Sequence, residues 1–122
     1  MPEVRHLDPA TPMPAQLQEK TGPVVLVNTF FVPREAMDEF LTLWGADAAV
    51  MKAQPGFIST QMHRGTAGSQ LLVNIAVWES TEALARAHAN PEFRKATAKL
   101  PDGVIAHPHV FEKIAVEGVC VA

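Results

Sequence analysis

Residues Val24–Phe31, with the sequence VVLVNTFF, restrict the fold more than any other segment of the chain. Successive side chains of an extended strand point to opposite faces, so Val24 and Leu26 share one face while Val25 and Val27 share the other. Both faces are therefore apolar, which is typical of a strand that is covered on both sides. We expect this strand to lie inside a layered domain that mixes helices with a sheet.

A long helix is expected directly after this strand. Pro33 suits the first turn of a helix, where a missing N–H costs nothing. The helix should run to about Lys52, and the sequence Gln54-Pro55-Gly56 should end it in a turn. Apolar residues recur through it at helical spacing, namely Met37, Phe40, Leu41, Trp44, Ala48 and Met51.

The second half of the chain shows a hairpin, two short helices and a final extended segment. The hairpin joins strands at Phe57–Arg64 and Gln70–Trp78. Ser80 and Asn90 are suited to cap helices at Thr81–Ala89 and Glu92–Leu100. The last segment, Val104–Val116, is expected to be extended, with its clearest strand at Val110–Val116 and Pro108 marking a break or a sheet edge.

This order of elements predicts an α+β fold of the ferredoxin-like, split β-α-β type. Its four-stranded antiparallel sheet would carry helices on one face only. A second copy of the same sheet is the simplest cover for the other face, so we expect a homodimer.

Residues 1–22 differ from the rest of the chain because they hold four of its ten prolines and show no apolar periodicity. We interpret them as an extended arm that is either mobile or laid across a neighbouring surface. Only Pro14–Lys20 is compatible with a helix. The folded domain is expected over residues 23–117, followed by a short tail at 118–122.

Charge and composition exclude several functions. A formal net charge of −3 offers no basic excess for binding nucleic acid. No apolar run approaches the roughly 20 residues of a membrane span, and no signal segment is visible. Since Cys120 is the single cysteine, no internal disulfide can form, and a cytoplasmic location is expected. Motifs for nucleotide cofactors are missing.

Several local sequences resemble the antibiotic biosynthesis monooxygenase (ABM) family of dimeric α+β barrels. The resemblance extends over about residues 23–116 and rests on FFVP at 30–33, QPGF at 54–57, AVWES at 76–80 and HANPEF at 88–93. The family includes cofactor-free oxygenases of aromatic polyketides, quinol oxygenases and haem-degrading enzymes. The resemblance implies a pocket between the helices and the sheet.

Asn28 and His88 are the candidate catalytic residues. Asn28 is the one strongly polar side chain in an apolar strand, where it could anchor a substrate oxygen or make a structural hydrogen bond. His88 could act as acid or base, or be an ordinary satisfied histidine. The walls of a substrate pocket are expected to come from large apolar side chains, namely Phe30, Phe40, Trp44, Phe57 and Met62.

Other polar and aromatic residues have plainer interpretations. Asn74 is expected to form hydrogen bonds at the dimer interface or between sheets. The Trp78 ring is expected to pack in the core or at an interface. His107 and His109 could together hold a metal ion, but no third ligand lies close in sequence. The arginines are interpreted as solvent-exposed charged residues.

Whether the chain fits the haem-degrading branch of the family can be tested by comparing the residues at the three functional positions of that branch. Asn28 coincides with the asparagine of that branch, but the tryptophan position falls on Ala87 and the histidine position on Thr97. Two of the three residues are therefore missing.

The resulting hypothesis is a small cofactor-independent monooxygenase that oxidises an aromatic polyketide- or quinol-like compound with O2. An electron-rich phenolate or enolate can itself reduce O2, so the protein needs only a dry pocket, a hydrogen-bond donor and a proton acceptor. The alternative is a non-catalytic barrel that binds a small hydrophobic molecule or serves as an accessory subunit. A haem-binding homologue is the third hypothesis.

Overall fold

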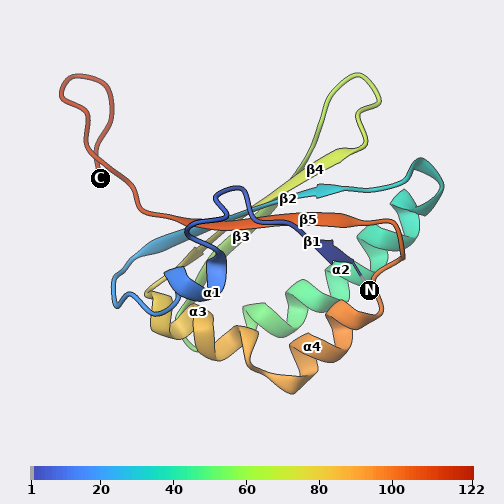
Figure 1. Ribbon diagram of the computed structural model, residues 1–122, viewed down its shortest axis with the longest axis horizontal. Coiled ribbons are helices and arrows are strands. Elements are labelled where there is room, and N and C mark those ends of the chain that lie inside the picture. Colours follow the sequence, from blue (N-terminus) through green and yellow to red (C-terminus); the bar gives the residue numbers. More distant parts are fainter. Residues whose placement is uncertain (1) are drawn as a thin grey trace.

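Five strands form one mixed sheet in the order β1-β5-β2-β4-β3, and three helices cover one face of it (Figure 1). The computed structural model describes residues 2–122. The strands are β1 (Glu3–Val4), β2 (Val24–Phe31), β3 (Phe57–Arg64), β4 (Leu71–Trp78) and β5 (Ile105–Phe111). The helices are α1 (Met13–Gln16), the short 3-10 helix η1 (Arg34–Ala36), α2 (Met37–Lys52), α3 (Thr81–His88) and α4 (Pro91–Ala98).

The ferredoxin-like α+β arrangement is confirmed, and most elements lie where the sequence predicts them. Strands β2 and β3 have the predicted bounds. The two predicted caps also form: the Ala83 N–H donates to Ser80 Oγ over 3.1 Å, and the Glu92 N–H donates to Asn90 Oδ1 over 2.8 Å. Capping side chains satisfy N–H groups that the first helical turn leaves free.

The last strand differs from its prediction. It is Ile105–Phe111 and not Val110–Val116, because antiparallel pairing with β2 places Ile105 opposite Phe31 and Phe111 opposite Val25. The following residues extend past the end of β2 and have no strand to pair with. Pro108 is tolerated inside β5 because it stands at one of the alternate positions whose backbone groups point away from β2, to the outer edge of the sheet.

A row of non-hydrophobic positions crosses the middle of the sheet. Asn28 of β2 lies opposite Asn74 of β4 on one side and opposite Pro108 of β5 on the other. Two separate hydrophobic clusters lie on either side of this row. Leu26 belongs to the first cluster and Phe30 to the second, so the core is divided beneath the two asparagines.

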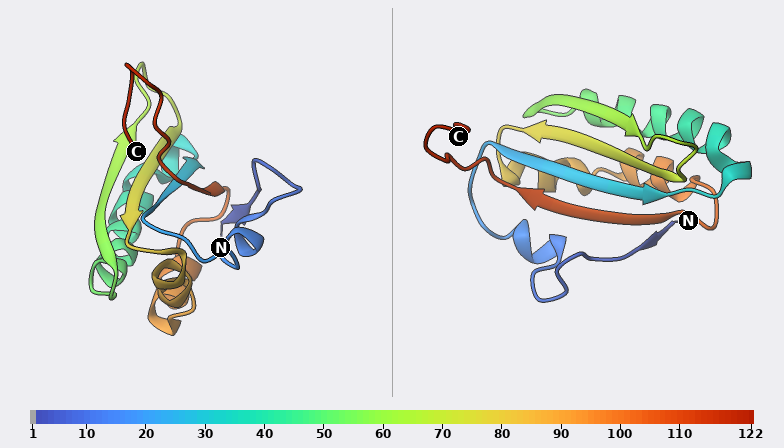
Figure 2. Two further views of the ribbon diagram at one scale, coloured as in Figure 1. Left: turned by 90° about the vertical axis from the view of Figure 1, so that its left-hand side faces the viewer. Right: turned by 90° about the horizontal axis from the view of Figure 1, so that it is seen from above.

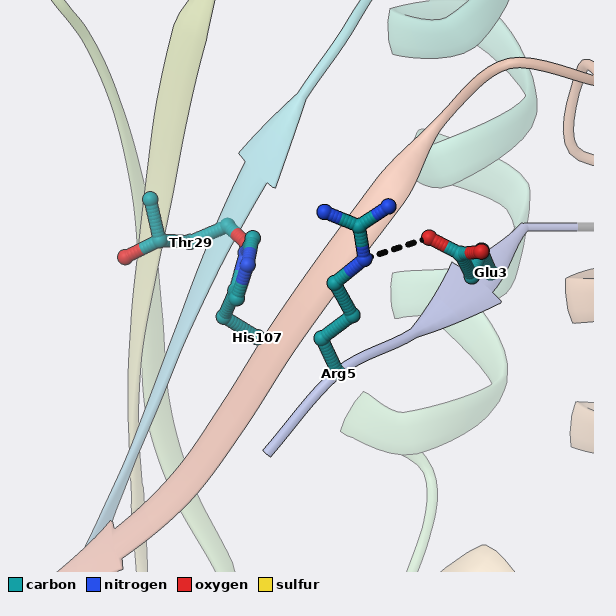
Figure 3. Close-up of polar contacts among 4 residues, drawn as sticks. All are labelled: Glu3, Arg5, Thr29 and His107. Carbon is teal, nitrogen blue, oxygen red and sulfur yellow. Dashed lines mark hydrogen bonds and ion pairs between the residues drawn. The ribbon is translucent and has the colours of Figure 1, made fainter. Parts of the chain in front are cut away.

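The N-terminal arm lies along the outer edge of β5 (Figure 2). The N–H groups of Glu3 and Arg5 donate to the carbonyls of Val104 and Ala106 over 2.9 and 2.8 Å. These bonds add β1 as a fifth strand to the four expected. Figure 3 shows the ion pair between Arg5 Nε and Glu3 Oε2 at 2.6 Å, beside β5.

Gln16 pairs with β5 through its side chain as another strand would through its backbone. Its Nε2 donates to the Val110 carbonyl over 2.9 Å, and its Oε1 accepts from the Val110 N–H over 3.0 Å. Met13, three residues earlier, is 5% exposed and belongs to the first hydrophobic cluster. The arm therefore contributes to the edge of the sheet and to the core.

The other face of the sheet carries no helix among residues 2–122 (Figure 1). Several large apolar side chains of this face and its edges are exposed, including Ile58, Leu71, Ile75 and Phe111. None of the helices in the described chain is long and apolar enough to cross a membrane.

Candidate functional site

A cavity of about 530 Å³ lies between the sheet and the helices, beneath the divided part of the core. This volume is within the usual range of about 300–1,000 Å³ for small-molecule sites. Strands β2 and β4 supply one wall, helices α2, α3 and α4 supply the opposite wall, and the N-terminal arm closes a side. Most of the lining is apolar, so the few polar groups in it stand out.

Asn28 and Asn74 lie side by side on the sheet wall, since they are register partners of neighbouring strands. Asn74 Oδ1 accepts a hydrogen bond from the Thr60 hydroxyl over 2.5 Å. Asn28 Oδ1 is buried and has no hydrogen-bond partner among residues 2–122. A buried acceptor without a partner is costly and calls for an explanation, and a ligand hydroxyl in the cavity would satisfy it.

Trp78 completes the sheet wall. It is 1% exposed, its ring meets Phe57 edge-on at 5.4 Å between centroids, and both side chains line the cavity. Its Nε1–H is buried and lacks a hydrogen-bond partner in the described chain. Packing therefore explains its ring, as the sequence predicts, but leaves its donor free for a ligand.

His88 lies on the helix wall, at the end of α3. Its Nδ1 is 3.3 Å from the Leu84 carbonyl, which can only accept, so Nδ1 carries the proton and Nε2 is left as an acceptor. Burial lowers the pKa of His88, against the opposing effect of the Leu84 carbonyl, and the nearby Arg94 lowers it further. A neutral imidazole is the form that can remove a proton.

Asp47 of α2 is a buried polar residue of the cavity that the sequence analysis missed. It is 6% exposed; Oδ2 accepts from the Thr97 hydroxyl over 3.2 Å, while Oδ1 is buried without a partner in the described chain. Burial raises its pKa to about 6, although the Thr97 hydrogen bond lowers it. The signal was present, because Asp47 falls at i+3 from Trp44 on the apolar stripe of the predicted helix.

The structure brings most of the predicted site residues together. Asn28 and His88 line the cavity, as do Phe30, Trp44 and Phe57. Phe40 and Met62 are not among its lining residues. Phe40 is fully buried behind Phe30, with 5.1 Å between ring centroids, and Met62 packs against the second hydrophobic cluster.

The arm contributes lining that the sequence analysis did not anticipate. Its contributions to the cavity are Pro2, Val4, His6, Met13, Pro14 and Leu17. The arm is held there at both ends, by β1 on β5 and by Thr81 of α3, whose N–H donates to the Thr21 carbonyl over 2.8 Å. The cavity wall therefore includes residues that lie outside the predicted domain.

The residues present do not fit a haem-degrading site. Ala87 and Thr97 occupy the two positions discussed above; Ala87 is buried in the core and Thr97 bonds to Asp47. His107 donates through Nδ1 to the Thr29 carbonyl, 3.3 Å away (Figure 3). Within residues 2–122 no group of three or more His, Cys, Asp or Glu side chains is placed to hold a metal ion.

Three comparisons with known proteins bear on this site. A family model described as antibiotic biosynthesis monooxygenase matches residues 23–99. A search of the curated proteins found no match. Solved structures, in contrast, match over most of the chain.

Among them is SnoaB, a cofactor-independent oxygenase from Streptomyces nogalater, with 30% identity and a TM-score of 0.72, covering 80% of this chain and 99% of SnoaB. A Shewanella loihica protein shows 31% identity and a TM-score of 0.64, with 78% and 97% of the two chains covered. Rv0793 from Mycobacterium tuberculosis shares the fold at 19% identity, with a TM-score of 0.65 over 79% and 99% of the two chains.

Proposed function

Since the chain belongs to the antibiotic biosynthesis monooxygenase family, we propose that it is a cofactor-independent monooxygenase acting on an aromatic polyketide- or quinol-like compound. The observation that carries this proposal is a pair of buried polar atoms without partners, Asn28 Oδ1 and Trp78 Nε1, in one apolar cavity. A hydroxylated aromatic ring satisfies an acceptor and a donor while filling apolar space. The likeness to SnoaB supports the same chemistry.

The first step is removal of a proton from the substrate. His88 is neutral at physiological pH because burial lowers its pKa, and its Nε2 lone pair takes the proton. For a hydroxyanthrone, this leaves an electron-rich enolate delocalised over the rings. The donors on the opposite wall, Trp78 Nε1 and the Asn28 amide nitrogen, stabilise the developing negative charge.

The enolate then reacts with O2 without any other reductant. One electron passes to O2, and the resulting radical pair combines to form a carbon–oxygen bond, giving a peroxide that takes a proton from His88. Loss of the remaining C–H proton breaks the O–O bond, and hydroxide leaves and is protonated. The balance is one CH2 group and one O2 giving one C=O group and one H2O.

The cavity serves this sequence by excluding water. Apolar walls such as Phe30 and Trp44 keep bulk solvent from the enolate, so the hydrogen bonds to it act in a medium of low dielectric constant. The pocket also holds the planar rings in one orientation relative to His88. Nothing in this sequence requires a bound cofactor.

Turnover of a hydroxyanthrone probe tests the proposal. We expect O2 consumption equal to the anthraquinone formed, at a rate above the uncatalysed oxidation in buffer. Asn28→Ala should abolish binding or turnover at small cost in stability, because water can replace the amide in the pocket. Thr29→Ala, one residue along the same strand, is the matched control and should leave both unchanged.

Two other outcomes have clear meanings. If Asn28→Ala lowers the free energy of unfolding by about 1–3 kcal/mol without affecting the probe, Asn28 is structural. If the wild type binds the probe but consumes no O2, the non-catalytic binding protein is the correct hypothesis.

The proposal includes a homodimer that covers the helix-free face of the sheet. Exposed apolar side chains on that face, Leu71 and Ile75 among them, support a self-complementary contact. Light scattering at micromolar concentration should give about twice 13.2 kDa. A stable monomer would contradict this part of the proposal.

A further inference from the structure

Asp47 is a buried acid that the proposed mechanism does not use. It lies on the helix wall of the cavity, whereas Asn28 and Asn74 lie on the sheet wall opposite. On α2 it shares one helical face with Trp44, Ala48 and Met51, all of which line the cavity. A carboxyl at the centre of an apolar face is unusual unless it has a partner.

We propose that Asp47 is a second catalytic residue, whose Oδ1 accepts a hydrogen bond from a second hydroxyl group of the substrate and takes its proton. This inference rests on the proposed function, since it assigns a role within the same cavity. It also narrows the substrate to aromatic compounds with hydroxyl groups at two separated positions, one facing each wall.

The hydrogen bonds of Asp47 support this role. Thr97 occupies Oδ2 and orients the carboxyl, which leaves Oδ1 as the free acceptor. A carboxyl kept for stability is normally paired with a cation or with several donors. None of the salt bridges among the described residues involves Asp47, and a single hydroxyl is its one hydrogen-bond partner there.

The charged surroundings of Asp47 are simple. The other titratable side chains that line the cavity are His88 of α3, Arg94 of α4 and His6 of the arm. The strands contribute asparagine and threonine but no titratable group to the lining. The pKa shift of Asp47 comes from burial and from Thr97. Because His88 also ionises in this cavity, the ionisation of Asp47 is identified from the difference between the wild type and an Asp47 variant.

With a pKa of about 6, Asp47 is ionised at neutral pH yet is a much stronger proton acceptor than an exposed carboxylate. It can take the proton of a phenolic hydroxyl as charge flows from the ring to O2, and it can return that proton to the same phenolate oxygen once the C=O group has formed, while the departing hydroxide takes the proton released from the C–H bond. The proton count of the reaction is unchanged, because the proton is borrowed and returned.

The test compares Asp47→Asn with Asp38→Asn, an exposed carboxyl on the same helix. With a dihydroxyanthrone as substrate, we expect kcat/KM to rise with pH through a midpoint near 6 in the wild type and in Asp38→Asn. Asp47→Asn should lower kcat/KM by about 100-fold and remove the part of that rise that comes from Asp47, leaving the part that comes from His88. An unchanged rate and pH profile in Asp47→Asn would overturn the inference.

Thr97→Val provides a second, graded test, because it keeps the carboxyl and removes the hydrogen bond that lowers its pKa. The midpoint of the pH profile should move upward while the maximal rate is retained. A purely structural role predicts a change in melting temperature with no movement of the midpoint.

Thermal melting checks that Asp47→Asn folds. The folded-state pKa of about 6 lies above the ordinary carboxyl pKa of 3.8, so the folded protein holds the proton of Asp47 more tightly than the unfolded chain does. The contribution of this raised pKa to the free energy of unfolding is fully present below pH 3.8 and is lost as the pH rises through 6. The amide avoids this loss, so Asp47→Asn should melt higher than wild type at pH values above the midpoint.

Binding separates this inference from the proposed function. A dihydroxyanthraquinone cannot be oxidised in this way, and its binding is followed by its visible absorbance. In one outcome, the wild type shows no turnover but binds the quinone more tightly above the pH midpoint of Asp47, and Asp47→Asn loses this pH dependence of binding. Asp47 then contacts the hydroxyl group, and the oxygenase proposal alone fails. Turnover with a rate independent of Asp47 makes the inference alone fail, and the absence of both binding and turnover overturns both.

Discussion

The two ends of the chain lie outside the matched region 23–99, and they differ in how they are covered. The arm, residues 2–22, is bonded to β5 and to Thr81, and Met13 within it is 5% exposed. The tail, residues 112–122, extends beyond the end of β5 and turns back on itself through a bridge between Val116 and Cys120 (Figure 2). All of its residues are exposed.

The difference shows what each end is suited to contact. The arm finds its partners within the same chain, at an open sheet edge and an incomplete cavity wall. The tail is also apolar, but Ile114, Val119 and Val121 are 71%, 80% and 83% exposed. Exposed apolar side chains near an uncovered sheet face are typical of an interface, so we expect the tail to meet a second copy.

Deleting residues 2–22 is expected to have the largest effect. The remaining domain should still fold cooperatively, because its four antiparallel strands and three helices are intact, but its stability should be lower because the buried Met13 side chain is lost. The cavity would lose a side, so binding of a dihydroxyanthraquinone should weaken by at least about tenfold. Thermal melting and absorbance titration measure the two effects. An insoluble product, or the loss of a cooperative melt, would show that the domain cannot fold without the arm.

Met13→Ala and Val119→Ala compare single apolar residues of the two ends. Removal of the buried Met13 side chain should cost about 2–5 kcal/mol in the free energy of unfolding. The same change at the exposed Val119 should stay within about 0.5 kcal/mol at protein concentrations below dimer formation. Urea unfolding of both variants gives the difference. Equal effects would remove the distinction between a docked arm and a free tail.

Removing residues 112–122 should weaken the dimer without changing the cavity. We expect the dissociation constant of the dimer to rise by about tenfold or more, which sedimentation across a concentration series measures. Ligand binding per chain should stay as in the wild type, since none of these residues lines the cavity. A dimer of unchanged affinity would assign the interface to the sheet face alone.

Gln16→Ala should have the most local effect. It leaves the Val110 N–H and C=O at a sheet edge without their partner, at a cost of about 1–3 kcal/mol. Gln18→Ala, an exposed glutamine of the same arm, is the matched control. Hydrogen exchange of the Val110 amide should quicken in Gln16→Ala and stay slow in the control.

Local patterns predicted the elements whose signals are local. The alternation in β2, the caps at Ser80 and Asn90, and the helical spacing before Lys52 all depend on residues within a few positions of one another, so the sequence could show them. The position of β5 depends instead on its register with β2, a strand far away in the chain. Pro108, taken as a break or a sheet edge, together with the apolar residues after it, favoured the wrong segment, Val110–Val116.

For the site, too, the sequence showed some features and the tertiary structure decided the others. The sequence by itself determined that Asn28 is polar in an apolar strand and that the first long helix has an apolar stripe, but the role of Asp47 beside that stripe was missed. Only the tertiary structure decided that Asn28 faces Asn74, that Phe40 lies behind Phe30 rather than in the cavity, and that the arm closes its side. The physical reason is that a cavity forms where two packed layers fail to meet, and that place is fixed by strand register and helix position together.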